Sequence, residues 1–321
     1  MDERSHRRLA EAVGGWAPDE LARLPDVALA DAGADAGADA VADADAVADA
    51  DAVAGDGAPG YYALVGSHAY GFATADSDVD IRGFHLADGR RYALLDRPAE
   101  RVQVPAVGDH EVDVALAPVE FESLELRAFA DALAGGDFAL VEAVLAAPVV
   151  REDVPAAVDS LRELLRDHLP LDLPCRYVGM ARSLYSELEA ASDEGEGDRN
   201  ELRAGDLKKA LYALRAVYAA EYVDEHGNVV ADVRDLARAV DGDPALVTAL
   251  IDARRAGGWP ESPEAGVSSL YDRTVDALER RLDAADYAEP TAAERDAFRD
   301  ALDEWQCETR GWSGVSTRRA E

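Results

Sequence analysis

Residues 66–83 read GSHAYGFATADSDVDIRG and contain two patterns that bear on chemistry. The first is Gly66-Ser67, which directly follows the apolar run 61–65. Glycine lets the backbone approach a ligand closely, and the start of a helical turn presents free N–H groups, so the turn is a predicted phosphate site. The second is Asp78-Val79-Asp80, whose two carboxylates lie on one face of a predicted strand.

The aspartate pair predicts a divalent-metal site. Two neighbouring carboxylates repel each other unless a cation lies between them, and hard oxygen ligands favour Mg²⁺. We therefore interpret Asp78 and Asp80 as metal ligands. The alternative is that Gly66-Ser67 is an ordinary turn and the aspartates lie on a solvent-facing strand of a very acidic protein.

The combination of an apolar strand, Gly-Ser and, a short interval later, Asp-x-Asp resembles the signature of the nucleotidyltransferase superfamily typified by DNA polymerase β. Within it, Ala69-Tyr70-Gly71 and the run Ser77–Gly83 resemble the RNA-repair-pathway polymerase-β-like nucleotidyltransferases. The resemblance implies an α+β fold. We expect a polymerase-β-like sheet with flanking helices, followed by an all-helical C-terminal domain.

A third carboxylate is implied by the same resemblance, on a strand next to the aspartates. Residues 110–116 alternate, which places Glu111 and Asp113 on one face of a predicted strand and apolar side chains on the other. Asp113 matches the position in the family, and Glu111 is the second choice. The alternative is a merely polar strand face.

The resemblance also implies a reaction. Asp78, Asp80 and Asp113 would hold two Mg²⁺ ions, and a nucleoside monophosphate would pass from an NTP, ATP among them, to an acceptor hydroxyl with release of pyrophosphate. Gly66 and Ser67 would bind the triphosphate. The acceptor stays open at this point: the family name suggests RNA, and a protein hydroxyl or a small molecule is the alternative.

Two further interpretations stay open at this point. Arg82, two residues beyond Asp80, would add a cation near the phosphates unless it forms a structural ion pair. A protein of another class, a catalytically silent nucleotide-binding regulator or an antitoxin-like protein, would keep the fold without turnover. The complete carboxylate set argues against this class.

A second group of candidate ligands lies in residues 206–215, which read DLKKALYALR. On a helix Lys208, Tyr212 and Arg215 form one stripe. Lys208 and Lys209 are the only lysines in the chain. The run resembles the helix that follows the catalytic domain in the family, which implies that these four residues bind the nucleotide or the acceptor. The alternative is a solvated helix face.

Charge and composition limit the classes of partner that the protein can be expected to bind. The formal net charge is −34, from 66 acidic residues against 32 lysines and arginines. Such self-repulsion is costly unless salt screens it, and at molar ionic strength the Debye length is about 3 Å. The acid-rich, lysine-poor and alanine-rich composition resembles halophilic proteins of salt-saturated archaeal cytoplasm. It argues against broad non-specific DNA binding, which needs a basic surface.

No membrane partner is expected, because no apolar run approaches the length of a membrane span. With only two cysteines, the chain is expected to be cytoplasmic. We expect a helical segment over 1–29, a disordered Ala/Asp-rich insertion over 30–57, a catalytic domain over 58–150 and a helical domain over 151–321. Strands are predicted near 61–66, 78–86 and 111–117, and helices over 120–133, 138–147, 155–169, 174–191, 206–223, 232–240, 243–256 and 291–305.

Overall fold

The computed structural model describes residues 9, 18–26, 28–29, 57–93, 98–104, 119–169, 172–193, 204–260 and 269–312. They form two compact units. The sheet unit takes its described residues from Met1–Ala69, Ala75–Asp167 and Ala292–Glu321, and the helical unit takes them from Tyr70–Thr74 and His168–Thr291. The domain boundaries expected from the sequence run linearly along the chain, whereas these compact units are discontinuous.

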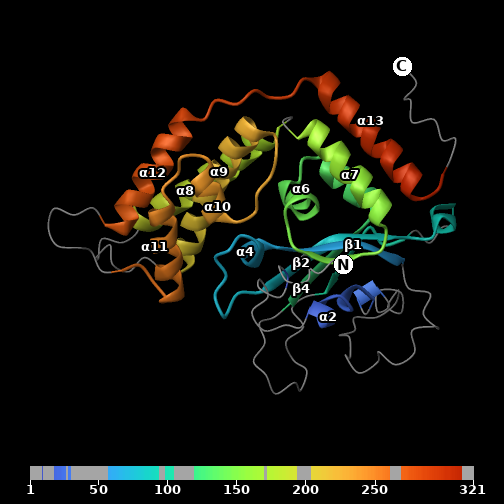
Figure 1. Cartoon of the computed structure of the whole chain (residues 1–321), viewed down its shortest axis with the longest axis horizontal. Coiled ribbons are helices and arrows are strands. Elements are labelled where there is room, and N and C mark those ends of the chain that lie inside the picture. The colour runs from blue at the N-terminus through green and yellow to red at the C-terminus, as the bar shows by residue number, and fades with distance from the viewer. Residues whose placement is uncertain are drawn as a thin grey trace. The chain divides into compact units, whose positions relative to one another are not determined.

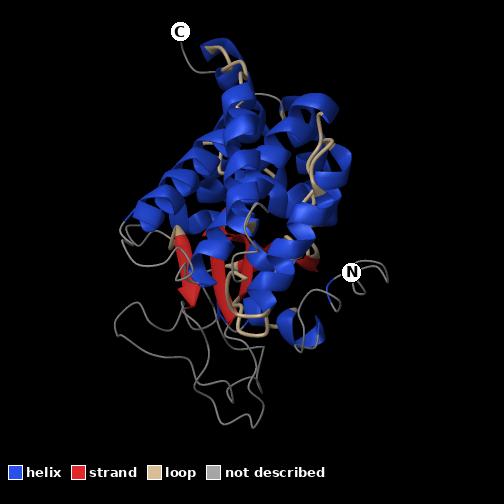
Figure 2. Ribbon diagram, turned by 90° about the vertical axis from the view of Figure 1, so that its left-hand side faces the viewer, coloured by secondary structure: helices blue, strands red, loops and turns tan. Residues whose placement is uncertain are grey.

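A five-stranded sheet in the order β3-β4-β2-β1-β5 organises the sheet unit (Figure 1). The central strand β2 pairs antiparallel with β1 and parallel with β4, and β3 adds antiparallel to β4 at one edge. Within the described residues, strands occur in this one sheet and helices make up most of the rest (Figure 2). The strands are β1 Ala58–Val65, β2 Val79–Leu86, β3 Arg101–Val104, β4 Val119–Glu125 and β5 Val149–Glu152.

Both faces of the sheet are packed. Alternation along β2 sends Val79 and Ile81 to one face, where they join a core that includes Leu9 and Leu21, the last residue of α2 (Pro18–Leu21). Phe84 lies on the other face, with its ring centroid 4.9 Å from that of Phe129 and 5.9 Å from that of Trp305. Further helices of this unit are α4 Gly66–Ala69, α5 Leu126–Ala134, α6 Phe138–Leu145, α7 Pro155–His168 and α13 Ala292–Thr309, with a short 3-10 helix at Gly89–Ala93.

The helix predicted over 120–133 is wrong for its first part, because residues 119–125 form strand β4. Val119 and Phe121 alternate with glutamates at period two, and strand pairing with β2 on one side and β3 on the other satisfies the backbone. The helix begins only at Leu126, where the side chain of Glu125 accepts a hydrogen bond from the Arg127 N–H.

Two other predictions lie outside the described residues: the strand at 111–117, with Glu111 and Asp113, and all of the Ala/Asp-rich segment except Gly57. Strands β3 and β5 have no counterpart among the elements predicted from the sequence. The predicted strands near 61–66 and 78–86 are confirmed as β1 and β2.

The helical unit is built around α9, which packs against α8, α10, α11 and α12. Helix α9 is buried along most of its length, so it has little amphipathic character. Asp232 and Asp243 cap α10 and α11, with Pro244 in the first turn of α11. The bounds are α8 Leu173–Asp193, α9 Ala204–His226, α10 Val233–Ala239, α11 Pro244–Arg255 and α12 Leu270–Ala284.

None of the helices in the described part of the chain combines the length and the apolar composition needed to cross a lipid bilayer.

A buried polar chain in the sheet predicts a pH dependence of stability. His85 is 0 % exposed, and its Nδ1 lies 2.8 Å from the hydroxyl of Ser123, which lies 2.9 Å from the hydroxyl of Tyr62. Burial lowers the pKa of His85 to about 4. The unfolded chain, with an imidazole pKa of about 6.5, therefore binds a proton that the folded protein excludes.

Proton binding to His85 in the unfolded chain therefore favours unfolding at low pH. We expect the free energy of unfolding to be unaffected by this proton above about pH 6.5, and to fall by on the order of 3 kcal/mol as the pH drops towards about 4. Guanidinium unfolding of the wild type and of His85→Gln, in molar KCl across this range, measures it. The wild type should lose stability relative to the variant on acidification. Parallel losses in the two proteins would contradict the prediction.

Candidate active site

The turn Gly66-Ser67 and the carboxylate of Asp80 lie in direct contact. Strand β1 ends at Val65, which pairs with Asp80 of β2, and the short helix α4 (Gly66–Ala69) begins immediately afterwards. Gly66 has φ +67°, and a Cβ placed there would lie 2.1 Å from Oδ2 of Asp80. Only glycine accommodates both the left-handed backbone and the approach of the carboxylate. The fold thus brings together the two patterns that stand apart in the sequence.

The turn is also tied to the approach to Asp78. Ser67 is buried, and Nε2 of His68 donates a hydrogen bond of 3.1 Å to the carbonyl oxygen of Ser77. This bond closes the chain between residues 68 and 77 into a loop at its base. His68 therefore has a structural partner at the site.

The donor set of the site suits Mg²⁺. Asp78 is half-buried directly before β2, and Asp80 is the second residue of the strand. Among the described residues, no three or more histidine, cysteine, aspartate or glutamate side chains lie close enough together to hold a metal ion. Mg²⁺ is commonly bound by one or two carboxylates while water and substrate phosphates complete its shell. The two aspartates fit this mode.

Glu120 is a candidate that the sequence interpretation missed. In the parallel pairing of β2 and β4, Asp80 lies opposite Glu120 and Arg82 lies opposite Glu122. The side chain of Glu120 is exposed and makes no hydrogen bond or ion pair with another described residue. In the sequence, the alternation of apolar and acidic residues over 119–122 indicates a strand that carries Glu120 on one face. Glu120 occupies a strand neighbouring β2, the setting that the resemblance assigns to Asp113, which lies outside the described residues.

These side chains line an open pocket of about 460 Å³ that spans β2, β4 and β3. Within it Nε of Arg82 lies 3.2 Å from Oε2 of Glu122, and Arg101 of β3 pairs with the same carboxylate. Of the two interpretations that the sequence left open for Arg82, the ion pair is the one present. The pocket is lined by Asp80, Ile81, Arg82, Gln103, Glu120, Phe121 and Glu122.

The two lysines of α9 face different surroundings. Lys208 is exposed, whereas Nζ of Lys209 lies 2.9 Å from Oε2 of Glu187 on α8. Lys208 therefore carries no ion pair with another described residue, and Lys209 does.

The other two candidates on this helix lie inside the helical unit. Arg215 is 0 % exposed, and its guanidinium carbon lies 3.6 Å from the centroid of the Tyr70 ring. The ring of Tyr212 packs edge-on against Tyr70 and Phe72. The stripe predicted as one cationic face thus divides into an exposed lysine, a half-buried tyrosine and a buried arginine, and the last two contact Tyr70 or Phe72.

Comparison with known proteins is consistent with this geometry. A family profile described as RlaP, the RNA repair pathway DNA polymerase beta family, matches residues 60–308. The chain belongs to this family. The membership confirms the resemblance read from residues 66–83 and the α+β polymerase-β-like fold.

A search of curated proteins gave no significant match. Among solved structures, a nucleotidyltransferase-like protein from Exiguobacterium sibiricum 255-15 is similar at 12% identity over 70% of each chain, with a TM-score of 0.26. That score is too low to bear on fold or function.

The contact at Gly66 predicts the effect of a single methyl group. Gly66→Ala adds a Cβ into the Asp80 carboxylate and imposes a left-handed backbone on alanine, whereas Gly227→Ala, at φ +57°, meets no atom within 4 Å of its Cβ. The control Gly227→Ala should therefore lower the free energy of unfolding only by the cost of the left-handed backbone, about 1–2 kcal/mol. Gly66→Ala should lower it by roughly 1–3 kcal/mol more, because its Cβ also overlaps the carboxylate. Denaturant unfolding in molar KCl measures both, and equal losses would count against the contact.

Proposed function

We propose that this protein transfers a nucleoside monophosphate from an NTP to an acceptor hydroxyl and releases pyrophosphate. The observation that carries the proposal is the contact between the Gly66-Ser67 turn and the Asp80 carboxylate, in a chain that belongs to a family of polymerase-β-like nucleotidyltransferases. A phosphate-binding turn against a metal-binding carboxylate is what nucleotidyl transfer requires, because the triphosphate and the cation must be held together.

Each residue then has a distinct task. Backbone N–H groups of Gly66 and Ser67, with the Ser67 hydroxyl, bind the triphosphate and offset the charge that develops on the departing pyrophosphate. Asp78 and Asp80 hold the divalent cation, which we propose to be Mg²⁺ at two positions. Bound there, the cation supplies Lewis-acid chemistry, lowering the pKa of the acceptor hydroxyl and neutralising phosphate charge.

Glu120 is our first choice for the third carboxylate, with Asp113 as the alternative. Lying opposite Asp80 without another partner among the described residues, Glu120 is placed to accept the proton of the acceptor hydroxyl. The acceptor oxygen forms a bond to the α-phosphorus as the bond from the α-phosphorus to the bridging oxygen breaks. Pyrophosphate carries away that electron pair, and the proton stays on the carboxylate until water removes it.

The cationic residues have secondary tasks in this proposal. Arg82 lines the same pocket as Asp80 and would turn from Glu122 towards a phosphate. On α9, Lys208 is the exposed candidate for a triphosphate or acceptor phosphate, and Lys209 would first have to leave Glu187.

We propose an RNA end as the acceptor, since the description of the family names RNA repair. A net charge of −34 supports working conditions of high salt, in a cytoplasm where electrostatic repulsion from a polyanion is screened. The same charge favours the alternative of a compact acceptor, a protein hydroxyl or a small molecule.

The first test is nucleotide transfer itself. Purified protein in molar KCl with Mg²⁺, each α-labelled NTP and either RNA oligonucleotides or cell extract should yield a labelled product that ribonuclease destroys and protease does not. Asp78→Asn with Asp80→Asn should reduce labelling about a thousandfold or more, since the cation is no longer held. Asp76→Asn is the matched control, an exposed aspartate in the same connection.

Unchanged labelling in the double variant would contradict the proposed reaction. Binding of NTP with Mg²⁺ but no release of pyrophosphate would instead identify the silent regulator.

A second test separates the two candidates for the third carboxylate. Glu120→Gln should lower kcat by about 10²- to 10⁴-fold with little change in the KM for NTP, because a proton acceptor is lost while the triphosphate contacts remain. Asp113→Asn is measured in parallel. A full rate in Glu120→Gln together with loss of activity in Asp113→Asn would transfer the assignment to Asp113.

A further inference from the structure

Residues 70–74 belong to the helical unit although they lie in the chain between the two halves of the proposed site. Gly66–Ala69 directly before them and Asp78 after them belong to the sheet unit. The chain therefore leaves the sheet unit after Ala69 and returns to it at Ala75. Contacts that fix residues 70–74 therefore also restrain the connection between the Gly66-Ser67 turn and the aspartates at 78 and 80.

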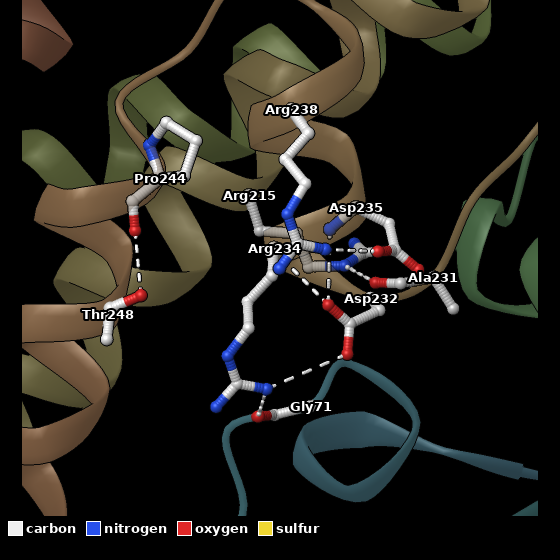
Figure 3. A network of polar contacts seen from close by, with 9 residues as sticks. All are labelled: Gly71, Arg215, Ala231, Asp232, Arg234, Asp235, Arg238, Pro244 and Thr248. Carbon is white, nitrogen blue, oxygen red and sulfur yellow. Dashed lines mark hydrogen bonds and ion pairs between the residues drawn. The ribbon is translucent and has the colours of Figure 1, made fainter.

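The N-terminus of α10 holds the backbone of this segment (Figure 3). Val233 N donates to the carbonyl oxygen of Tyr70 at 3.1 Å, and Nη1 of Arg234 donates to that of Gly71 at 3.0 Å. Gly71 has φ +81°, and a Cβ there would lie 2.1 Å from Oδ2 of Asp232. Asp232 is itself fixed, because its Oδ1 accepts hydrogen bonds from the backbone N–H groups of Arg234 and Asp235.

The side chains of the segment are enclosed as well. The guanidinium of Arg215 covers the ring of Tyr70 and donates from Nε to the carbonyl oxygen of Ala231 at 2.9 Å. Tyr212 packs edge-on against Tyr70 and Phe72, and the guanidinium carbon of Arg254 lies 5.3 Å from the centre of the Phe72 ring. A stacked, desolvated guanidinium is a stronger restraint than a surface ion pair.

We propose that Arg215, Asp232 and Arg234 are positioning residues: they act through Tyr70 and Gly71 to fix the Gly66-Ser67 turn against Asp80. That the turn binds a triphosphate rests on the proposed function, whereas the restraint itself does not. A turn that is pre-organised by the helical unit binds phosphate without first being ordered, so its loss weakens binding. Arg215 has this task in place of the direct nucleotide contact expected from the sequence.

The hydrogen bond between His68 and Ser77 can be followed without a nucleotide, and it reports whether the turn is held in place. The hydrogen bond from His68 Nε2 to the Ser77 carbonyl closes the chain on both sides of residues 70–74. If the contacts of α10 with Gly71 position the turn, removing them should break the hydrogen bond of the His68 imidazole. A protected imidazole N–H signal in ¹⁵N NMR, assigned with His68→Gln, reports that bond.

The experiment compares Arg234→Met with Arg238→Met. Both variants remove one cation from α10, but the exposed Arg238 pairs with Asp235 at 2.8 Å and contacts none of residues 70–74 among the interactions of the described chain. We expect Arg234→Met to lose the His68 signal and to weaken binding of ATP in Mg²⁺, measured by calorimetry, about tenfold or more. Arg234→Lys should recover part of the loss, and Arg238→Met should match the wild type.

A folded Arg234→Met that keeps both the signal and the wild-type affinity would overturn the inference. If that variant does not fold, Asp232→Asn, which keeps the cap but removes the charge beside Gly71, is read by the same two measurements. Should the wild type bind none of the four NTPs in Mg²⁺, the proposed function fails, and the His68 signal alone decides whether the helical unit positions the turn.

Discussion

The approach of the Asp80 carboxylate to the α-carbon of Gly66 is the constraint on which the rest of the site depends. It fixes the residue type at position 66, because a side chain would occupy the space of the carboxylate and the backbone is left-handed there. It also fixes the register of β1 against β2, since Val65 must lie opposite Asp80. Once this register is set, the parallel neighbour β4 brings Glu120 beside Asp80, and the pocket follows from three adjacent strands.

Residues 70–74, which directly follow the Gly66-Ser67 turn and α4 in the chain, are held within the helical unit. Arg215, Tyr212 and the first turn of α10 enclose residues 70–72. Helix α9 is buried along most of its length because α8, α10, α11 and α12 pack against it. Its conspicuous groups stabilise a connection, and Lys208 remains at the surface.

The parts of the fold that sequence predicts well are those with local physical causes. Strands β1 and β2 were predicted correctly, because their apolar runs and the Gly66-Ser67 turn that ends β1 act within a few residues of where they stand. Glu120 was missed because its period-two alternation is short and runs directly into the helical pattern of α5, so a single helix accounted for both.

The burial of Arg215 could not be predicted from its own surroundings. Its stacking partner Tyr70 is distant in sequence, and an arginine at i+7 from a lysine looks like a member of an exposed stripe. Likewise, the assignment of residues 70–74 to the helical unit depends on contacts with α9 and α10 that no local pattern encodes.

The central claim, that Gly66-Ser67 and the aspartates form one site for a metal-bound triphosphate, is tested most directly by electron paramagnetic resonance of Mn²⁺ as a substitute for Mg²⁺. With ATP, wild-type protein in molar KCl should give a protein-bound Mn²⁺ signal that broadens when the phosphates carry ¹⁷O, and Asp80→Asn should abolish it. A bound signal that persists unchanged in Asp80→Asn would contradict the account.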